Sequence, residues 1–245
     1  MIHAKSNKKQ ACLFFMNSEY RVHSYRWDLG MAQQERARAT REKIVDGAAL
    51  TFYRLGYGLA TTGDIAHEAG VTRGAMYFHF QSKEDLARAV IAKEQSLALA
   101  ASNHIHAMNR SALETMIMLC ADLARRLLAD PVVRAGVRLT TEVTNFDPPL
   151  RSSFDEWMRT FSHLAAQAIA DGDFGSGVNP EKFARFLIPA FTGIQLVSDT
   201  YTGREDLLQR VCEMWEYILP SVVPANTLEI AQRRLDEIIP DTTKE

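Results

Sequence analysis

Apolar side chains recur every third or fourth residue along most of this chain, which is the spacing of one face of an α-helix. Within residues 35–55, for example, Ile44, Ala48 and Phe52 follow this spacing, and Gly56 comes directly afterwards. Because glycine readily adopts the left-handed conformation that follows many helix ends, we expect this helix to stop there. We find no segment with the strict alternation of a half-buried strand, and no internal repeat. The pattern therefore predicts an all-α protein.

Three helix starts follow in close succession. A threonine or serine stands before each of them, where its side chain can accept a hydrogen bond from a free N–H group of the first turn. These residues are Thr62, Thr72 and Ser82. We expect two short helices, 63–69 and 73–78, separated by a glycine-containing turn, and a long helix that begins near Lys83. Two short helices joined by a tight turn are the arrangement of a helix-turn-helix.

Longer amphipathic segments fill the rest of the chain. We expect helices at 112–129, 131–144, 149–170, 180–201, 205–219 and 228–239. The segment 172–179 is rich in Gly, Asp and Ser, and it is expected to be a loop. With 47% apolar residues among 245, the chain can bury a substantial core.

The first thirty residues differ from everything that follows. They mix Lys, Asn, Ser, Tyr and His without helical periodicity, and a strongly helical pattern begins at Met31. We interpret residues 1–30 as a flexible leader or an upstream-start extension, and a basic arm that contacts DNA is the alternative. A helix-turn-helix domain at 31–82 and a larger helical domain at 83–245 complete the predicted organisation.

Charge is distributed unevenly along the chain. Residues 1–83 hold twelve Lys and Arg against seven Asp and Glu, whereas the remainder holds sixteen against twenty-three. The formal net charge of −2 argues against a protein that coats nucleic acid indiscriminately. The uneven distribution instead predicts one basic face on an otherwise acidic protein.

Several functional classes find no support in the sequence. Cys12, Cys120 and Cys212 show no paired spacing, so we expect reduced thiols in a cytoplasmic protein. No apolar run is long enough for a signal peptide or a membrane span. No hydrolase, metalloprotease or nucleotide-binding motif is present, and the pair His104 and His106 has no clustered partner. We therefore expect no catalytic residues, no metal site and no cofactor.

The second short helix carries chemistry suited to DNA. Its Arg73 can pair with guanine O6 and N7, while the small Gly74 and Ala75 let a helix approach the bases. Thr72, Tyr77, His79 and Lys83 add donors for phosphates or base edges. We expect Ile65, Ala69, Val71 and Met76 to face inward toward Phe52. Phe78 and Phe80 are expected in the core.

The segment from Ile44 to Leu86 resembles the N-terminal domain of the TetR repressor family without a gap. The positions that carry the resemblance are Ala48, Phe52, Gly56-Tyr57, Thr61-Thr62, Ile65-Ala66, Ala69-Gly70-Val71, Tyr77-Phe78-His79-Phe80 and Lys83-Glu84-Asp85-Leu86. The resemblance implies a three-helix domain that binds palindromic operator DNA as a homodimer, with the third helix in the major groove. The DNA-binding residues implied by position and chemistry are Thr62, Thr72, Arg73, Gly74, Ala75, Tyr77, His79 and Lys83.

The C-terminal domain resembles the γ-butyrolactone receptor branch of that family. The resemblance rests on Asp130 to Thr140, Pro148-Pro149, Phe154 to Trp157, and Glu213-Met214-Trp215. It implies a repressor that leaves DNA when it binds a small lactone or furan autoregulator of antibiotic-producing bacteria. It also places helices 180–201 and 205–219 in the dimer interface. The domain 83–245 is therefore expected to bind the ligand and to dimerise.

The same resemblance places Trp157 in the ligand pocket. An indole offers a flat apolar wall and one N–H donor. The polar groups expected around the ligand are those of Thr192, Gln195, Thr141 and Gln95. The apolar residues expected there are Leu119, Val137, Phe161 and Phe191. Ordinary core packing is the alternative interpretation for each of these side chains.

The sequence therefore predicts a ligand-responsive repressor, released by a γ-butyrolactone, butenolide or furan and controlling secondary metabolism. The alternative is a TetR-type repressor that senses an antibiotic or another hydrophobic drug.

Overall fold

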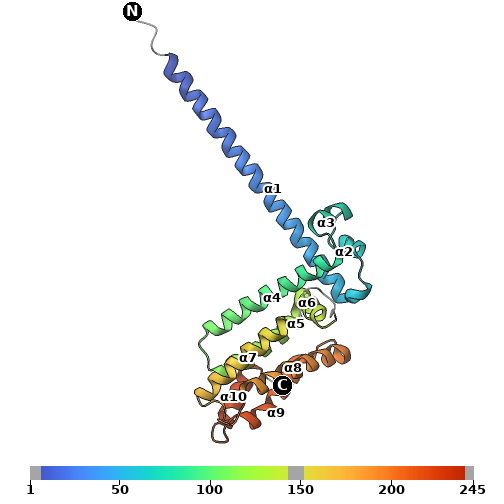
Figure 1. Cartoon of the computed structure of the whole chain (residues 1–245), viewed down its shortest axis with the longest axis vertical. Coiled ribbons are helices and arrows are strands. Elements are labelled where there is room, and N and C mark those ends of the chain that lie inside the picture. The colour runs from blue at the N-terminus through green and yellow to red at the C-terminus, as the bar shows by residue number, and fades with distance from the viewer. Residues whose placement is uncertain (1–6, 143–151, 241–245) are drawn as a thin grey trace, which may run out of the picture.

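Ten helices and no strands make up the residues that this computed structural model describes, 7–142 and 152–240 (Figure 1). The helices are α1 (Asn7–Leu59), α2 (Thr62–Glu68), α3 (Arg73–His79), α4 (Lys83–Ala107), α5 (Ala112–Ala129), α6 (Pro131–Glu142), α7 (Ser152–Ala170), α8 (Pro180–Thr202), α9 (Leu207–Val222) and α10 (Leu228–Ile238). The predicted all-α class is confirmed. The expected helix end at Thr144 and helix start at Pro149 lie outside the described residues.

Helix α1 is long and is interrupted near its end. Gly56 has φ 72° and ψ 170°, so the helix breaks where the sequence predicts. The expected start was wrong, because the helix extends back to Asn7 rather than beginning near Met31. Residues 7–29 contain neither Gly nor Pro, so no strong helix breaker interrupts them. Their half of α1 points away from the remaining helices (Figure 1). The assignment of residues 1–30 as a leader stays a prediction.

The N-terminal domain is built by α1, α2, α3 and the start of α4 around one apolar core. Phe52, Ile65 and Met76 are fully buried in this core, and Phe80 is 4% exposed. Helix α2 lies so close to α1 that a Cβ atom on Gly47 would stand 2.7 Å from the backbone nitrogen of Ala69. The absence of a side chain at this position is therefore what allows the two helices to pack.

The turn between α2 and α3 has the predicted form. Gly70 adopts φ 63°, and the Val71 N–H donates to the Ala66 carbonyl. The predicted cap at Thr62 is wrong by one residue, since Thr61 occupies the N-cap. Its hydroxyl accepts from the Asp64 N–H, and the Asp64 carboxylate accepts from the Thr61 N–H at 3.0 Å. This reciprocal pair is a capping box, which Thr62 has no partner to form.

The C-terminal domain packs α5, α7, α8, α9 and α10 around a second core. Trp215 of α9 is fully buried there, beside Phe183 of α8. Helix α4 connects the two domains, because Leu86 belongs to the first core and Ile105 to the second. Helix α6 lies between them and packs against α1, α4 and α5.

Candidate functional site

Helix α3 presents a polar, largely exposed face beside α2. Thr72, Arg73 and Gly74 are exposed, Ala75 is half-buried, and Tyr77 is 45% exposed. The Thr72 hydroxyl also accepts from the Ala75 N–H at 3.1 Å, so it caps the helix that it begins. These predicted base-facing residues therefore share one accessible surface at the start of a helix.

Two of the predicted DNA-binding side chains contact each other. The hydroxyls of Thr62 and Tyr77 lie 3.1 Å apart and share a hydrogen bond between α2 and α3. The guanidinium of Arg73 lies against α2, where a Cβ atom on Gly63 would be 2.8 Å from one of its nitrogens. The structure therefore fixes the exposed face of α3 relative to α2.

Lys83 has a different environment from the one expected of a phosphate ligand. Its ammonium donates to the carbonyls of Tyr57 at 2.8 Å, Ala60 at 3.1 Å and Gly58 at 3.5 Å. It also lies 4.5 Å from the centre of the Tyr57 ring. Lys83 therefore holds the connection between α1 and α2. A direct phosphate contact stays a prediction, and it requires at least one of these bonds to open.

Phe78 corrects one expectation of the sequence. It is 79% exposed instead of buried, and its ring meets the half-buried His79 ring edge-on at 5.2 Å. The buried positions Met76 and Phe80 are four residues apart and define the inner face of α3. A residue two positions from each of them points to the opposite side of the helix. Phe78 thus belongs to the exposed surface together with Tyr77.

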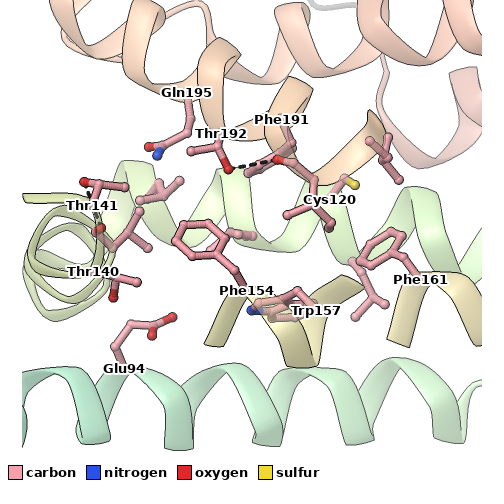
Figure 2. Close-up of a pocket in the computed structure, with 16 residues that line it drawn as sticks. Glu94, Cys120, Thr140, Thr141, Phe154, Trp157, Phe161, Phe191, Thr192 and Gln195 are labelled. Carbon is pink, nitrogen blue, oxygen red and sulfur yellow. Dashed lines mark hydrogen bonds between the residues drawn. The ribbon is translucent and has the colours of Figure 1, made fainter. Parts of the chain in front are cut away.

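A cavity lies in the C-terminal domain between α4, α5, α6, α7 and α8. Its volume is about 90 Å³ (Figure 2). It is lined by Glu94, Leu119, Cys120, Leu123, Leu127, Val137, Thr140, Thr141, Phe154, Trp157, Phe161, Leu187, Ile188, Phe191, Thr192 and Gln195. Eight of the nine predicted pocket residues are in this set. Gln95 is not, and it instead lines a neighbouring hollow with Leu99, Ser102 and Thr160.

Aromatic rings and a few polar groups give the cavity its chemistry. Trp157 and Phe161 lie with ring centres 6.1 Å apart, and Figure 2 shows Trp157 beside Phe154. Gln195 is 4% exposed, and its Oε1 has no hydrogen-bond partner among the described residues. An apolar cavity with few polar groups suits a small ligand that carries few oxygen atoms.

The threonine hydroxyls in the cavity donate to their own helices. Thr140 donates to the Gly136 carbonyl at 2.9 Å, and Thr192 donates to the Ile188 carbonyl at 2.8 Å. Thr141 likewise donates within α6, to the Arg138 carbonyl at 2.8 Å. Each hydroxyl hydrogen is therefore used, and only oxygen lone pairs remain to face a ligand.

The sequence did not predict Glu94 and Cys120. Burial raises the pKa of the Glu94 carboxyl to about 7, partly offset by the charge of Arg126. Burial also raises the pKa of the Cys120 thiol to about 12, so this thiol stays protonated. A signal for Glu94 exists, because it occupies a buried position in register with the buried residues Val90, Ile91 and Ala98 of α4.

Helix α6 connects the cavity with the N-terminal domain. One face supplies Val137, Thr140 and Thr141 to the cavity. On another face, Arg138 donates to the Tyr53 carbonyl at 2.7 Å and also binds Glu142. The Glu142 carboxylate accepts from the Tyr57 N–H at 3.1 Å, across the break at Gly56. We call these two residues, Arg138 and Glu142, which bind backbone atoms of α1, the α6 clamp.

A second arginine of α6 strengthens the same interface. Arg134 donates to the Tyr53 hydroxyl at 3.2 Å, and its guanidinium lies 5.1 Å from the centre of that ring. It also donates to the Leu127 and Leu128 carbonyls at the end of α5. Arg134 thereby joins α1, α5 and α6.

Comparison with known proteins finds a matching family model in each half of the chain. Residues 44–90 match the family model described as bacterial regulatory proteins, tetR family, and residues 110–224 match that of the tetracyclin repressor-like C-terminal domain. The A-factor receptor protein of Streptomyces griseus is 34% identical over 192 residues, which cover 78% of this chain and 67% of that protein. The chain therefore belongs to the TetR family of bacterial regulatory proteins.

Solved structures give the same result. A crystal structure of an ArpA-like γ-butyrolactone receptor superposes with a TM-score of 0.74 and is 29% identical, covering 84% of this chain and all of that one. CprB from Streptomyces coelicolor, in complex with its operator sequence, superposes with a TM-score of 0.73 and is 31% identical. This match also covers 84% of this chain and all of the CprB chain.

Proposed function

We propose that this protein is a ligand-responsive transcriptional repressor that binds palindromic operator DNA as a homodimer. A small γ-butyrolactone, butenolide or furan releases it from the operator. One observation carries the proposal: the cavity is lined by α4 and α6, and both helices also pack into the core of the N-terminal domain. The relatives similar over most of the chain include γ-butyrolactone receptors, which favours such a signal over a hydrophobic drug.

The size of the cavity suggests how a ligand acts. About 90 Å³ is less than the ~300–1,000 Å³ of pockets that enclose drug-sized ligands. A larger ligand therefore has to displace parts of the lining, and α4 and α6 are attached to the N-terminal domain. Displacement of these helices changes the separation of the two N-terminal domains in a dimer. Because the coupling is reciprocal, operator DNA weakens ligand binding by the same factor.

Dimerisation is proposed to use α8 together with α9. The exposed residues Phe186, Val197 and Tyr201 of α8 follow helical spacing, and Tyr217 of α9 is 85% exposed. Gly193 lies in the same stripe with no atom within 4 Å of an added Cβ, which leaves room for a close helix. Exposed apolar side chains in one stripe are typical of a protein interface.

Other properties follow from this function. Within residues 7–142 and 152–240, none of the helices has the length and hydropathy needed to cross a bilayer. We place the protein in the cytoplasm, where operator DNA is found, and assign it regulation of secondary metabolism instead of catalysis. Its relatives are transcriptional regulators.

The proposal is tested on DNA upstream of the protein's own and neighbouring genes. A mobility-shift assay is expected to show binding to a palindromic site and release by synthetic butyrolactones, butenolides or furans. Arg73→Ala serves as the matched variant and is expected to weaken binding about 10- to 100-fold, since a good base contact contributes about 1–3 kcal/mol. Arg110→Ala, which removes a charge from the connection between α4 and α5, is the control. Binding to no such palindrome would contradict the function.

The α6 clamp gives a second test. Arg138→Ala removes the contact with the Tyr53 carbonyl but no residue that lines the cavity. We expect ligand affinity of the free protein to stay within about twofold of the wild type. The factor by which operator DNA weakens ligand binding is expected to fall at least about fivefold, within the usual range of coupling energies. Calorimetric titration with and without operator DNA measures both quantities.

Arg159→Ala is the matched control, because that exposed arginine donates to the Asp155 carbonyl of its own helix and to no other group among the described residues. An unchanged coupling factor in Arg138→Ala would show that the α6 clamp does not transmit the signal.

A further inference from the structure

Glu94 is the one charged side chain among the described residues that line the cavity. It extends from α4 toward the cavity, across from Gln195 of α8 (Figure 2). Glu94 is 9% exposed, and burying a carboxylate is costly unless a donor compensates it. The hydrogen-bond donors available to Glu94 therefore influence which ligands the cavity can bind.

The Glu94 carboxylate has no such donor among the described residues. It forms no hydrogen bond or ion pair with any of them. The charge that acts on it most is that of Arg126 of α5, whose Nε binds Asp122 at 2.7 Å and whose buried Nη1 has no hydrogen-bond partner among the described residues, so it does not bind Glu94 either. The hydroxyl hydrogens of the nearby Thr140 and Thr141 are directed to backbone carbonyls of α6. A ligand is thus left to supply the donor.

Contact with α6 also restricts the direction of Glu94. A Cβ atom on Gly136 would lie 2.5 Å from the Glu94 Cβ and 2.7 Å from its Cγ. The stem of the side chain therefore fills the space that Gly136 leaves open. This packing holds the carboxylate at the cavity wall.

We propose that Glu94 selects the ligand by charge, accepting a hydrogen bond from a hydroxyl or N–H group and rejecting a carboxylate. This inference rests on the proposed function and narrows it to a neutral, hydroxyl-bearing lactone or butenolide. A furan that carries a carboxylate is excluded, because two anions would then face each other in an apolar cavity. Glu94 thus acts as a specificity-determining residue.

The ionisation of Glu94 fits this role. Burial raises the pKa of its carboxyl to about 7, so at pH 8 the group is mostly anionic and at pH 6 mostly neutral. Of the other titratable groups near it, the Cys120 thiol of α5 keeps its proton over this range, and Arg126 of α5 is paired with Asp122. From α7, Glu156 borders the neighbouring hollow, and α6 contributes Gly136 and the two threonines. The rejection of a carboxylate should therefore weaken as the pH falls from 8 to 6.

The experiment compares two synthetic γ-butyrolactones with the same alkyl side chain. One carries a hydroxymethyl group, and in the other a carboxylate replaces it. Calorimetric titration of the full chain at pH 8 is expected to show at least about a thirtyfold preference for the hydroxymethyl compound, given the strength of hydrogen bonds to charged groups. Glu94→Gln is expected to reduce this preference at least about fivefold. Glu156→Gln, which removes an exposed carboxylate outside the cavity, is expected to keep it.

Each outcome decides the matter. Equal or tighter binding of the carboxylate compound by the wild type at pH 8 overturns the inference, and so does an unchanged preference in Glu94→Gln. Binding of neither compound also overturns it. A wild-type preference that shrinks at pH 6 supports it without any variant. If the hydroxymethyl compound binds selectively but does not release operator DNA, the proposed function fails and the charge selection stands.

Discussion

Replacing Gly47 with alanine is expected to weaken operator binding at least about tenfold and to destabilise the N-terminal domain by about 2–3 kcal/mol. The added Cβ would lie 2.7 Å from the Ala69 nitrogen and 2.9 Å from its Cα. These are backbone atoms at the end of α2, so no side-chain rotation can relieve the contact. Helix α2 must move, and it carries α3 with it through the turn at Gly70. Thermal unfolding and operator titration measure the two effects.

Gly58→Ala is the matched control for this substitution. Gly58 belongs to the same helix, but an added Cβ there would meet no atom within 4 Å. We expect its unfolding temperature and operator affinity to match the wild type. Ligand binding should survive in both variants, because neither Gly47 nor Gly58 lines the cavity. A Gly47→Ala protein with wild-type stability and affinity would refute the close-packing argument.

The second large effect is expected from the double variant Phe186→Asp with Val197→Asp. Both side chains are exposed on α8, at 60% and 45%, so the isolated chain should fold normally. Two carboxylates in an apolar interface would be buried without partners, which should separate the dimer. A monomer contacts only one half-site of the operator. The affinity gained from two linked contacts is then lost, and operator affinity should fall at least about 100-fold. Sedimentation and operator titration test this.

Ile230→Asp provides the control, since Ile230 is an exposed apolar residue of α10, outside the proposed interface. It should remain dimeric with unchanged operator affinity. A double variant that still sediments as a dimer would show that copies associate through another surface.

The fold was largely predictable because helical periodicity and capping residues are local signals. The bounds of α5 agree with the sequence to the residue, and Gly56 and Gly70 mark the turns as expected. The errors have local causes as well. Thr61 competes with Thr62 for the cap, and only Thr61 has Asp64 three residues later. The register of the very short α3 decides whether Phe78 faces inward.

The cavity was harder to predict, because its walls come from five helices whose arrangement no local pattern encodes. Trp157 was identified through a family resemblance, and its predicted neighbours were chosen for their chemistry on mostly apolar helices. Gln95 and Glu94 show the limit of that approach. They are adjacent on α4 and about 100° apart around its axis, so only one of them faces the cavity. The sequence analysis predicted the Gln95 amide at the cavity, and the structure places the Glu94 carboxylate there instead.

The division of α6 into two faces has a consequence for how such receptors diversify. Val137, Thr140 and Thr141 touch the cavity, while Arg134 and Arg138 grip α1 from the same twelve-residue helix. Substitutions on the first face can change which signal is recognised without altering the contacts that reach the N-terminal domain. Exchange of a few residues that line the cavity can therefore change which signalling molecule is recognised. The operator sequence and the contacts between α6 and α1 can stay the same.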